Sequence, residues 1–244
     1  MRRVRFRDVD GRSRTGEWTD DGIVYGGETY DPDAVDILPP TTPSKIVGVS
    51  TNHRDLVEER DDLEWPDRPK LFVKTPNTVV GHGHTAKLMP DIDFIYEGEL
   101  TVVIGEQCKN VTAENAYDVV EGFTCMNEIS NHTDLDKYAA RRKSTDDMAP
   151  VGPVIVPPDQ VPEDATVELR VNGDVRQRSD RTRYIYGVRE AIEEATRYFT
   201  LEPGDLIPLG SPPGPDILED GDHVEVEIEG IGTLEHDVRI GSSS

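Results

Sequence analysis

The pattern of apolar and polar positions divides the chain into short strand-like segments separated by turns. Residues 2–38 alternate weakly and are interrupted by Asp-Gly and Gly-Gly pairs, which indicates a small β-rich unit. The proline-rich segment 38–45 can extend neither a helix nor a central strand. We therefore expect a small N-terminal domain over residues 1–43 and a larger domain over residues 44–244.

Strands dominate the pattern of the larger domain. Apolar or alternating runs predict strands at residues 45–50, 71–74, 94–105, 167–171 and 223–240. Helical spacing predicts one amphipathic helix within 187–200 and a short helix at about 113–121, and residues 51–65 have helical character. The chain shows no strand-helix-strand alternation and no repeat. The expected fold class is therefore α+β, mainly β, with a mixed or antiparallel sheet.

Acidic residues outnumber basic ones throughout the chain. There are 49 Asp and Glu against 26 Lys and Arg, and the formal net charge is -23. Nucleic acid is a poor partner for such a surface, because phosphate binding relies on Lys and Arg. No apolar run approaches the roughly 18 residues that a membrane span needs. We expect a cytoplasmic protein that does not bind membranes, and the composition is typical of salt-adapted proteins.

One buried-looking run, FIYEGELTVVIG at residues 94–105, carries two carboxylates. Glu97 and Glu99 share one face of a strand, because side chains at i and i+2 point the same way. The spacing alone means little, since about ten such pairs are expected by chance in so acidic a chain. The apolar residues around the pair make it informative, because they indicate a buried segment and unpaired carboxylates are costly to bury. Between the two acids, Gly98 permits a close approach to the backbone.

Two interpretations of this pair stay open on the residues alone. A hard cation such as Mg²⁺, Mn²⁺ or Ca²⁺ would relieve the repulsion between Glu97 and Glu99, and Glu128 offers a third carboxylate. Alternatively, the acids form a solvated or arginine-paired edge of an acidic protein.

Six ordered segments resemble the fumarylacetoacetate hydrolase family: YEGELTVVIG, AENAYDVVEGFTCMNEIS, RKSTDDMAPVGP, VNGDVRQ, LEPGDLIPLGSPPG and GIGTLEHDV. The resemblance covers roughly residues 45–240 and extends to acylpyruvate hydrolases and 2-hydroxyhepta-2,4-diene-1,7-dioate isomerases. It implies a mixed β-sandwich roll, a homodimer and a site for Mg²⁺ or Mn²⁺. It also implies action on small carboxylate substrates, namely 2-oxo acids and acylpyruvate-like compounds.

The resemblance also implies roles for individual residues. Glu97, Glu99 and Glu128 match the metal ligands, although the third ligand is usually Asp. The family's lysine near metal and substrate matches Lys143 in RKSTDD, whose ammonium would hold a carboxylate or a developing enolate. Substrate-binding positions of the family fall on four further residues: Lys74, Gln177, Gly210 and Ser211. For Lys74, a salt bridge on an acidic protein is an equal alternative.

The chain differs from the family pattern at the residues that act as catalytic acid and base. In hydrolytic members the block N-Y-x-D-H-x-x-E supplies a His-Glu dyad that activates water, but here Leu56 stands in place of the histidine and Glu59 is kept. Glu59 alone would suit isomerisation or decarboxylation better than water attack. Otherwise another histidine replaces the missing one: His53, His82, His84 or His132.

These departures leave two classes of function. A bound divalent ion would stabilise the enolate that carbon-carbon cleavage, decarboxylation and tautomerisation share, which makes the chain a metal-dependent hydrolase, isomerase or decarboxylase. The alternative is a catalytically weak or inactive member that binds metal and a small carboxylate ligand.

Overall fold

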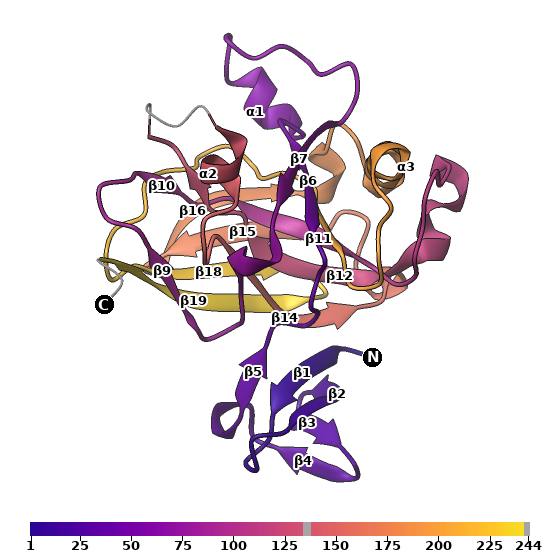
Figure 1. Cartoon of the computed structure of the whole chain (residues 1–244), viewed down its shortest axis with the longest axis vertical. Coiled ribbons are helices and arrows are strands. Elements are labelled where there is room, and N and C mark those ends of the chain that lie inside the picture. Colours follow the sequence, from indigo (N-terminus) through magenta and orange to yellow (C-terminus); the bar gives the residue numbers. More distant parts are fainter. Residues whose placement is uncertain (134–137, 242–244) are drawn as a thin grey trace.

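The computed structural model describes residues 1–133 and 138–241. Two β-sheets pack face to face in the larger part of the molecule, and the N-terminal strands form a separate lobe at the opposite end from the short helices α1 and α2 (Figure 1). Residues 134–137, part of the polar segment that the sequence suggests as surface or lid material, lie outside the described residues.

The large sheet is mainly antiparallel and has the strand order β4-β3-β2-β1-β14-β12-β11-β17-β6-β7. Parallel pairs join β17 to β6 and β8 to β14, so the sheet is mixed. Its strands are β1 (Arg3–Arg7), β2 (Ser13–Thr19), β3 (Gly22–Tyr25), β4 (Glu28–Tyr30), β5 (Asp36–Leu38), β6 (Ile46–Ser50), β7 (Lys70–Lys74), β8 (Val79–Val80), β11 (Gly98–Ile104), β12 (Val120–Asn127), β14 (Ala149–Val156) and β17 (Leu206–Pro208).

The second sheet has five strands in the order β16-β15-β18-β19-β9. They are β9 (Thr85–Leu88), β15 (Thr166–Val171), β16 (Asp174–Asp180), β18 (His223–Ile228) and β19 (Gly232–Ile240), and a small pair joins β10 (Phe94–Ile95) to β13 (Ser130–Asn131). Alternating burial along β15 and β18 directs their apolar residues toward the large sheet. The predicted mainly β, mixed-sheet architecture is confirmed.

Helices are few and short. The α-helices are α1 (Arg54–Glu58), α2 (Ala139–Lys143) and α3 (Val188–Tyr198), and the 3₁₀ turns are η1 (Pro32–Ala34), η2 (Pro76–Thr78), η3 (Ala113–Val119), η4 (Pro158–Gln160) and η5 (Arg181–Arg183). The predicted amphipathic helix corresponds to α3. The short helix expected near residue 113 is a 3₁₀ helix instead, and the side chain of Thr112 does not cap it. No helix among the described residues is long and apolar enough to cross a membrane.

The N-terminal lobe is joined to the rest of the molecule through the large sheet. β1 pairs with β14 over two residues, and Val4 and Phe6 of β1 belong to the main apolar core. The boundary expected between residues 43 and 44 falls in the coil between β5 and β6. The division into two domains stays a prediction.

Gly98, the glycine between the two acidic residues, faces the second sheet. A side chain at Gly98 would place its Cβ 3.0 Å from Cβ of Leu169 on the facing sheet. Gly98 therefore lets the two sheets approach closely on the side away from the carboxylates, which is the close approach to its backbone that the sequence predicts. The predicted strand also breaks here, because Tyr96 and Glu97 lie between β10 and β11.

Candidate metal and active site

Three carboxylates converge where β11 begins and β12 ends. Glu97 precedes β11, Glu99 lies within it, and Glu128 follows β12. Antiparallel pairing of Gly98 with Asn127 brings these positions together, and the N–H of Glu128 donates to the carbonyl of Glu97 at 2.7 Å. Oxygen atoms of the three side chains lie within 4.8 Å of one another. Strand pairing thus builds the cluster that the sequence suggested.

Hydroxyl and backbone groups hold two of the carboxylates from the neighbouring loops. The N–H of Gly210 donates to Oε2 of Glu99 at 2.6 Å, and Ser211 Oγ donates to Oε1 of Glu97 at 3.2 Å. Gly210 and Ser211 follow β17, which pairs with β11 on the side opposite β12. Ser130 Oγ lies 3.3 Å from Glu97 Oε2 and 3.0 Å from Glu128 Oε2. Both strands that flank β11 therefore contribute to the site.

Two lysine ammonium groups bind Glu128. Lys74, fully buried at the end of β7, donates to Oε1 of Glu128 and to the carbonyl of Ile129 at 2.7 Å. Lys143, at the end of α2, donates to Oε2 of Glu128 and to Ser130 Oγ at 2.6 Å. Its Nζ also lies 3.7 Å from Glu97 Oε2. Both ammonium groups therefore lie closest to Glu128, and the other two carboxylates have less positive charge beside them.

The pKa values follow this uneven pairing. Burial and the charge of Glu128 raise the pKa of Glu97 to about 7, although Lys143 partly opposes the rise. Burial and the two neighbouring carboxylates raise the pKa of Glu99 well above its ordinary value. Burial would also raise the pKa of Glu128, but Lys143 and Lys74 outweigh it and lower that pKa to about 2. Glu97 and Glu99 are thus the less compensated acids of the cluster, since Glu97 has only the more distant contact with Lys143.

This donor set fits a divalent cation. Carboxylate oxygens are the ligands that Mg²⁺ and Mn²⁺ prefer, and the lysines compensate the carboxylates of Glu97 and Glu99 less than that of Glu128. Glu128 keeps lone pairs beyond those that its two ammonium partners use. Glu97, Glu99 and Glu128 are the residues that would hold the ion.

A small pocket of about 40 Å³ opens beside the carboxylates. Phe72 and Leu56 form its apolar walls, and the ammonium of Lys143 lies 4.3 Å from the centre of the Phe72 ring. Gly48 on β6 makes room for that ring, because a Cβ there would fall 2.1 Å from Cζ of Phe72. No histidine of the described residues lines this pocket. Leu56 therefore faces the site with no imidazole to replace the expected base.

Several residues predicted for the site lie around the pocket rather than in it. Lys74 and Gln177 are both buried and do not line it. Gln177 Oε1 accepts from the N–H of Gly98 at 2.9 Å, and its Nε2 donates to the carbonyl of Pro212 at 2.7 Å. Gln177 therefore ties the start of β11 to the loop after β17. The contacts of Lys74 favour its salt-bridge interpretation over a substrate role.

The two residues predicted as acid-base groups on and beside α1 do not reach the pocket either. His53 is buried before α1 with its ring edge-on to Tyr184, and its Nδ1 lies 3.6 Å from Asp55. Burial lowers the pKa of His53. Glu59 is exposed just after α1, three residues beyond Leu56. The structure brings together the metal ligands, Lys143, Gly210 and Ser211, and leaves His53 and Glu59 outside.

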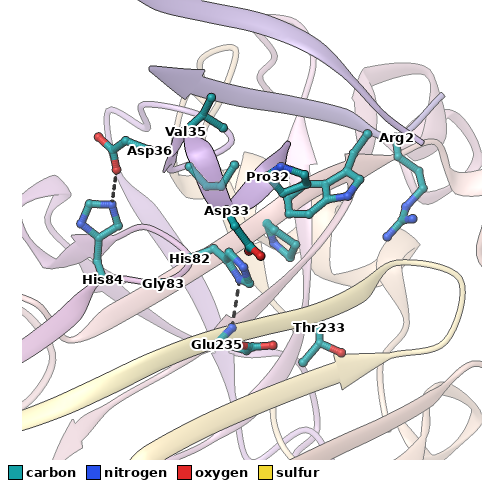
Figure 2. Close-up of a pocket in the computed structure, with 13 residues that line it drawn as sticks. Arg2, Pro32, Asp33, Val35, Asp36, His82, Gly83, His84, Thr233 and Glu235 are labelled. Carbon is teal, nitrogen blue, oxygen red and sulfur yellow. Dashed lines mark hydrogen bonds and ion pairs between the residues drawn. The ribbon is translucent and has the colours of Figure 1, made fainter. Parts of the chain in front are cut away.

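The other candidate histidines lie elsewhere. His82 and His84 line a separate cavity of about 590 Å³ between the N-terminal lobe and the rest of the molecule (Figure 2). His82 Nδ1 accepts from the N–H of Glu235 at 3.1 Å, and His84 Nε2 lies 2.8 Å from an oxygen of Asp36. His132 is exposed. The glycine-rich loop at residues 81–85 therefore does not close over the carboxylates in this structure.

Sequence reasoning assigned no role to Ser130 and Asn52, which the structure places at the site. Ser130 follows Glu128 by two residues, so the same i,i+2 rule that linked Glu97 to Glu99 could have found it. The Asn52 amide donates to the carbonyls of Tyr186 and Leu209 at 2.9 and 2.8 Å. It fixes the wall of the pocket, but both partners are distant in sequence and no local signal marks them.

Divalent metal is expected to stabilise the protein more at pH 8 than at pH 5. A buried acid with a raised pKa contributes stability that is present below its ordinary pKa and is lost as the pH rises through the raised value, here about 7 for Glu97. Metal binds the ionised form and restores that loss. Thermal melts with and without excess Mg²⁺ or Mn²⁺ at both pH values would check this. An equal shift at both values would contradict the assigned ligands.

Replacing the buried lysine is expected to destabilise the fold. Lys74→Met should cost about 3 kcal/mol, because breaking a buried ion pair leaves Glu128 with one ammonium and the carbonyl of Ile129 without its donor. Urea denaturation of the metal-free protein would measure the loss. The control Lys70→Met, exposed on the same strand, should change stability by no more than about 0.5 kcal/mol. Equal effects of the two variants would disprove a structural role for Lys74.

The fold and the site together define a class of protein: a β-sandwich with a buried, three-carboxylate centre suited to a hard divalent cation. The chain belongs to the fumarylacetoacetate hydrolase family, because the family model described as "Fumarylacetoacetate (FAA) hydrolase C-terminal" matches residues 45–239. The resemblance drawn from the six sequence segments is thereby confirmed.

Named relatives show the range of chemistry in this family. The chain is 38% identical to an oxaloacetate tautomerase of Bacillus subtilis over 212 residues, which cover 80% of this chain and 70% of the relative. It resembles the crystal structure of 5-carboxymethyl-2-hydroxymuconate delta-isomerase from Mycobacterium smegmatis with a TM-score of 0.89 and 32% identity, covering 100% of both chains.

A further solved structure, maleylpyruvate hydrolase from Sphingobium sp. SYK-6 in complex with manganese(II) and pyruvate, has a TM-score of 0.82 and 25% identity and covers 99% of this chain and 100% of that one. The relatives are thus named as isomerases, tautomerases and hydrolases. The chain is an enzyme of this family, and its reaction type is left open by the comparisons.

Proposed function

We propose that this protein is a Mg²⁺- or Mn²⁺-dependent enzyme that interconverts the keto and enol forms of a small 2-oxo acid, with decarboxylation through the same enolate as a second outcome. One observation carries the proposal: Lys143 and three carboxylates converge on a small pocket in which Leu56, not a histidine, forms the wall. Tautomerisation needs proton transfer at carbon but no activated water. The geometry therefore supports it better than hydrolysis.

The residues of the pocket divide the task among them. A divalent ion held by Glu97, Glu99 and Glu128 would supply a Lewis acid for the keto and carboxylate oxygens of the substrate. Lys143 keeps its proton, because the carboxylates of Glu128 and Glu97 outweigh the effect of burial and raise its pKa. Its ammonium can therefore donate to negative charge that develops on the substrate.

Apolar groups and one exposed acid complete the arrangement. Leu56 and Phe72 keep water away from the reacting carbon, which disfavours hydrolysis. Glu59 follows Leu56 by three residues, at the C-terminal end of α1, and is the acid there that the family resemblance predicts for proton transfer, although it lies outside the pocket in this structure. We assign it the role of the base that exchanges the proton at carbon. Relatives named as a tautomerase and an isomerase support this assignment of chemistry.

A second candidate function follows from the missing histidine. The pocket is small and no imidazole of the described residues lines it, so the protein could bind metal and a small carboxylate without turnover. The enzyme proposal and this alternative share the metal site but differ in catalysis. The homodimer, the cytoplasmic location and the salt-adapted origin expected from the sequence stay predictions.

The test is a tautomerisation assay with oxaloacetate as the first substrate. Loss of the ultraviolet absorbance of the enol reports tautomerisation, and a coupled assay for pyruvate reports decarboxylation. We expect a metal-dependent acceleration that chelation removes. A metal-dependent rise in melting temperature without consumption of any compound in a panel of 2-oxo acids would support the binding function instead. Hydrolysis of acylpyruvates as the main activity would contradict the proposal.

A further inference from the structure

Two buried, hydrogen-bonded side chains connect the backbone of Glu97 with the second sheet, away from the pocket. Asn127 is the last residue of β12 and His236 lies within β19, and both are almost completely buried. Neither lines the pocket. Asn127 Oδ1 accepts from the backbone N–H of Glu97 at 2.9 Å, and Asn127 Nδ2 lies 3.0 Å from His236 Nε2. The last contact of this row joins His236 Nδ1 to the backbone carbonyl of Asp237 at 3.2 Å.

The chemistry of the donors and acceptors fixes the direction of each of these hydrogen bonds. A backbone carbonyl only accepts, so Nδ1 of His236 carries the proton and Nε2 presents a lone pair. That lone pair must receive an N–H from Asn127, which turns the amide oxygen of Asn127 toward Glu97. Burial lowers the pKa of His236 to about 4, so the ring stays neutral at neutral pH. The imidazole therefore selects one of the two orientations of the Asn127 amide.

Glu97 needs such support because it lies at the break between β10 and β11. Its backbone N–H has no strand partner there, and Asn127 supplies the acceptor. Its side chain is also the most exposed of the three, with 21% of its surface accessible against 1% for Glu128. Gln177 supports the next residue in the same way, through the N–H of Gly98. Side chains from both sheets thus fix the backbone that presents the carboxylates.

We propose that His236 is a positioning residue for Glu97 and acts through the amide of Asn127. The proposal rests on the metal site of the proposed function, but not on the reaction that the enzyme catalyses. Without the lone pair of His236, the Asn127 amide is free to turn and present its NH₂ group to the N–H of Glu97. The backbone at Glu97 would then lose its acceptor, and the carboxylate would lose its fixed place.

The test compares two substitutions of His236 by direct Mn²⁺ titration. His236→Leu removes the acceptor, and outer partners of metal ligands typically contribute about 10- to 100-fold in affinity, so Mn²⁺ binding should weaken by that factor. His236→Gln restores an acceptor where Nε2 lies, and its affinity should stay within about 3-fold of the wild type. The control Thr124→Val alters another buried polar residue of β12, whose hydroxyl has no hydrogen-bond partner among the described residues, and should leave affinity unchanged.

Two measurements without metal keep the result interpretable. Amide hydrogen exchange at Glu97 should accelerate in His236→Leu and not in His236→Gln. In the wild type, nitrogen chemical shifts should show the proton of His236 on Nδ1, a reading that needs no variant and survives if His236→Leu does not fold. A proton on Nε2, or equal Mn²⁺ affinity in both variants, would overturn the proposal. Wild-type protein that binds Mn²⁺ but turns over no 2-oxo acid would refute the proposed function alone.

Discussion

The variant Glu97→Gln is expected to lose about 10³-fold in kcat/KM on any substrate that the enzyme accepts. A bound divalent ion contributes several kcal/mol to transition-state stabilisation, and about 4 kcal/mol corresponds to about three powers of ten. Glutamine keeps the size of the side chain and its contact with Ser211 but removes the negative charge. Metal-dependent assays with the variant would measure the loss. The metal-dependent rise in melting temperature should shrink with it.

The same substitution should not harm the metal-free fold. Glu97 carries a pKa raised to about 7, so its ionised form is unfavourable in the native state at pH 8. Replacing it with a neutral group should leave the metal-free protein at least as stable as the wild type. Loss of activity without loss of stability separates a ligand from a structural residue. Thermal melts at pH 8 in the presence of a chelator would show the difference.

A matched control uses an acid at the far end of the same strand. Glu106 is exposed just beyond β11, and Glu106→Gln changes the same charge without touching the cluster. It should retain wild-type activity and metal response. Full metal-dependent turnover by Glu97→Gln would remove this residue from the metal site. Equal losses in both variants would show that overall charge, and not ligation, is responsible.

The convergence of the carboxylates could be predicted from the sequence because it depends on local rules. Glu97 and Glu99 are two residues apart beside an apolar strand, and Glu128 follows another apolar run. Antiparallel pairing of those strands is enough to bring the three side chains together. The ordered family segments added Lys143, Gly210 and Ser211, which the structure also places at the site. Period-2 patterning and strand pairing carried this part of the prediction.

The partners of buried side chains could not be predicted in this way. Lys74 and Gln177 match family positions, yet their contacts depend on how strands and loops far apart in sequence approach one another. The sequence predicts a close approach to the backbone of Gly98, but only the structure identifies the neighbour as Leu169 on the facing sheet. No sequence periodicity reports which residues meet across two sheets.

The histidines show the same limit. His82 and His84 lie in a glycine-rich loop, and the sequence does not indicate which cavity this loop lines. In the structure it lines the cavity beside the N-terminal lobe (Figure 2). His53 is adjacent to Asn52, which contributes to the pocket, but its own ring packs against Tyr184. Two neighbouring residues therefore have different surroundings: Asn52 lies in the pocket wall, and His53 lies against the apolar core.

The variant Leu56→His is expected to gain hydrolysis of an acylpyruvate such as acetylpyruvate by about 10³-fold over the wild type. Leu56 lines the pocket, so an imidazole there would face the substrate, and a general base contributes about 10²- to 10⁴-fold. Glu59 lies three residues further along the same helix turn and can orient the new ring. The rate should rise with pH through about 6.5 as the imidazole loses its proton. Product analysis with Mg²⁺ or Mn²⁺ would measure it.

Two controls separate a new base from a merely altered pocket. Leu56→Phe introduces a ring that cannot accept a proton, and it should not gain hydrolysis. The double variant Leu56→His/Glu59→Gln keeps the base but loses its orienting carboxylate, so its gain should fall between the two. If Leu56→Phe hydrolyses acetylpyruvate as fast as Leu56→His, water access and not proton transfer limits the reaction. If only the histidine variants gain activity, position 56 decides whether the enolate site admits an activated water, and the wild-type leucine explains why the proposed reaction is tautomerisation and not hydrolysis.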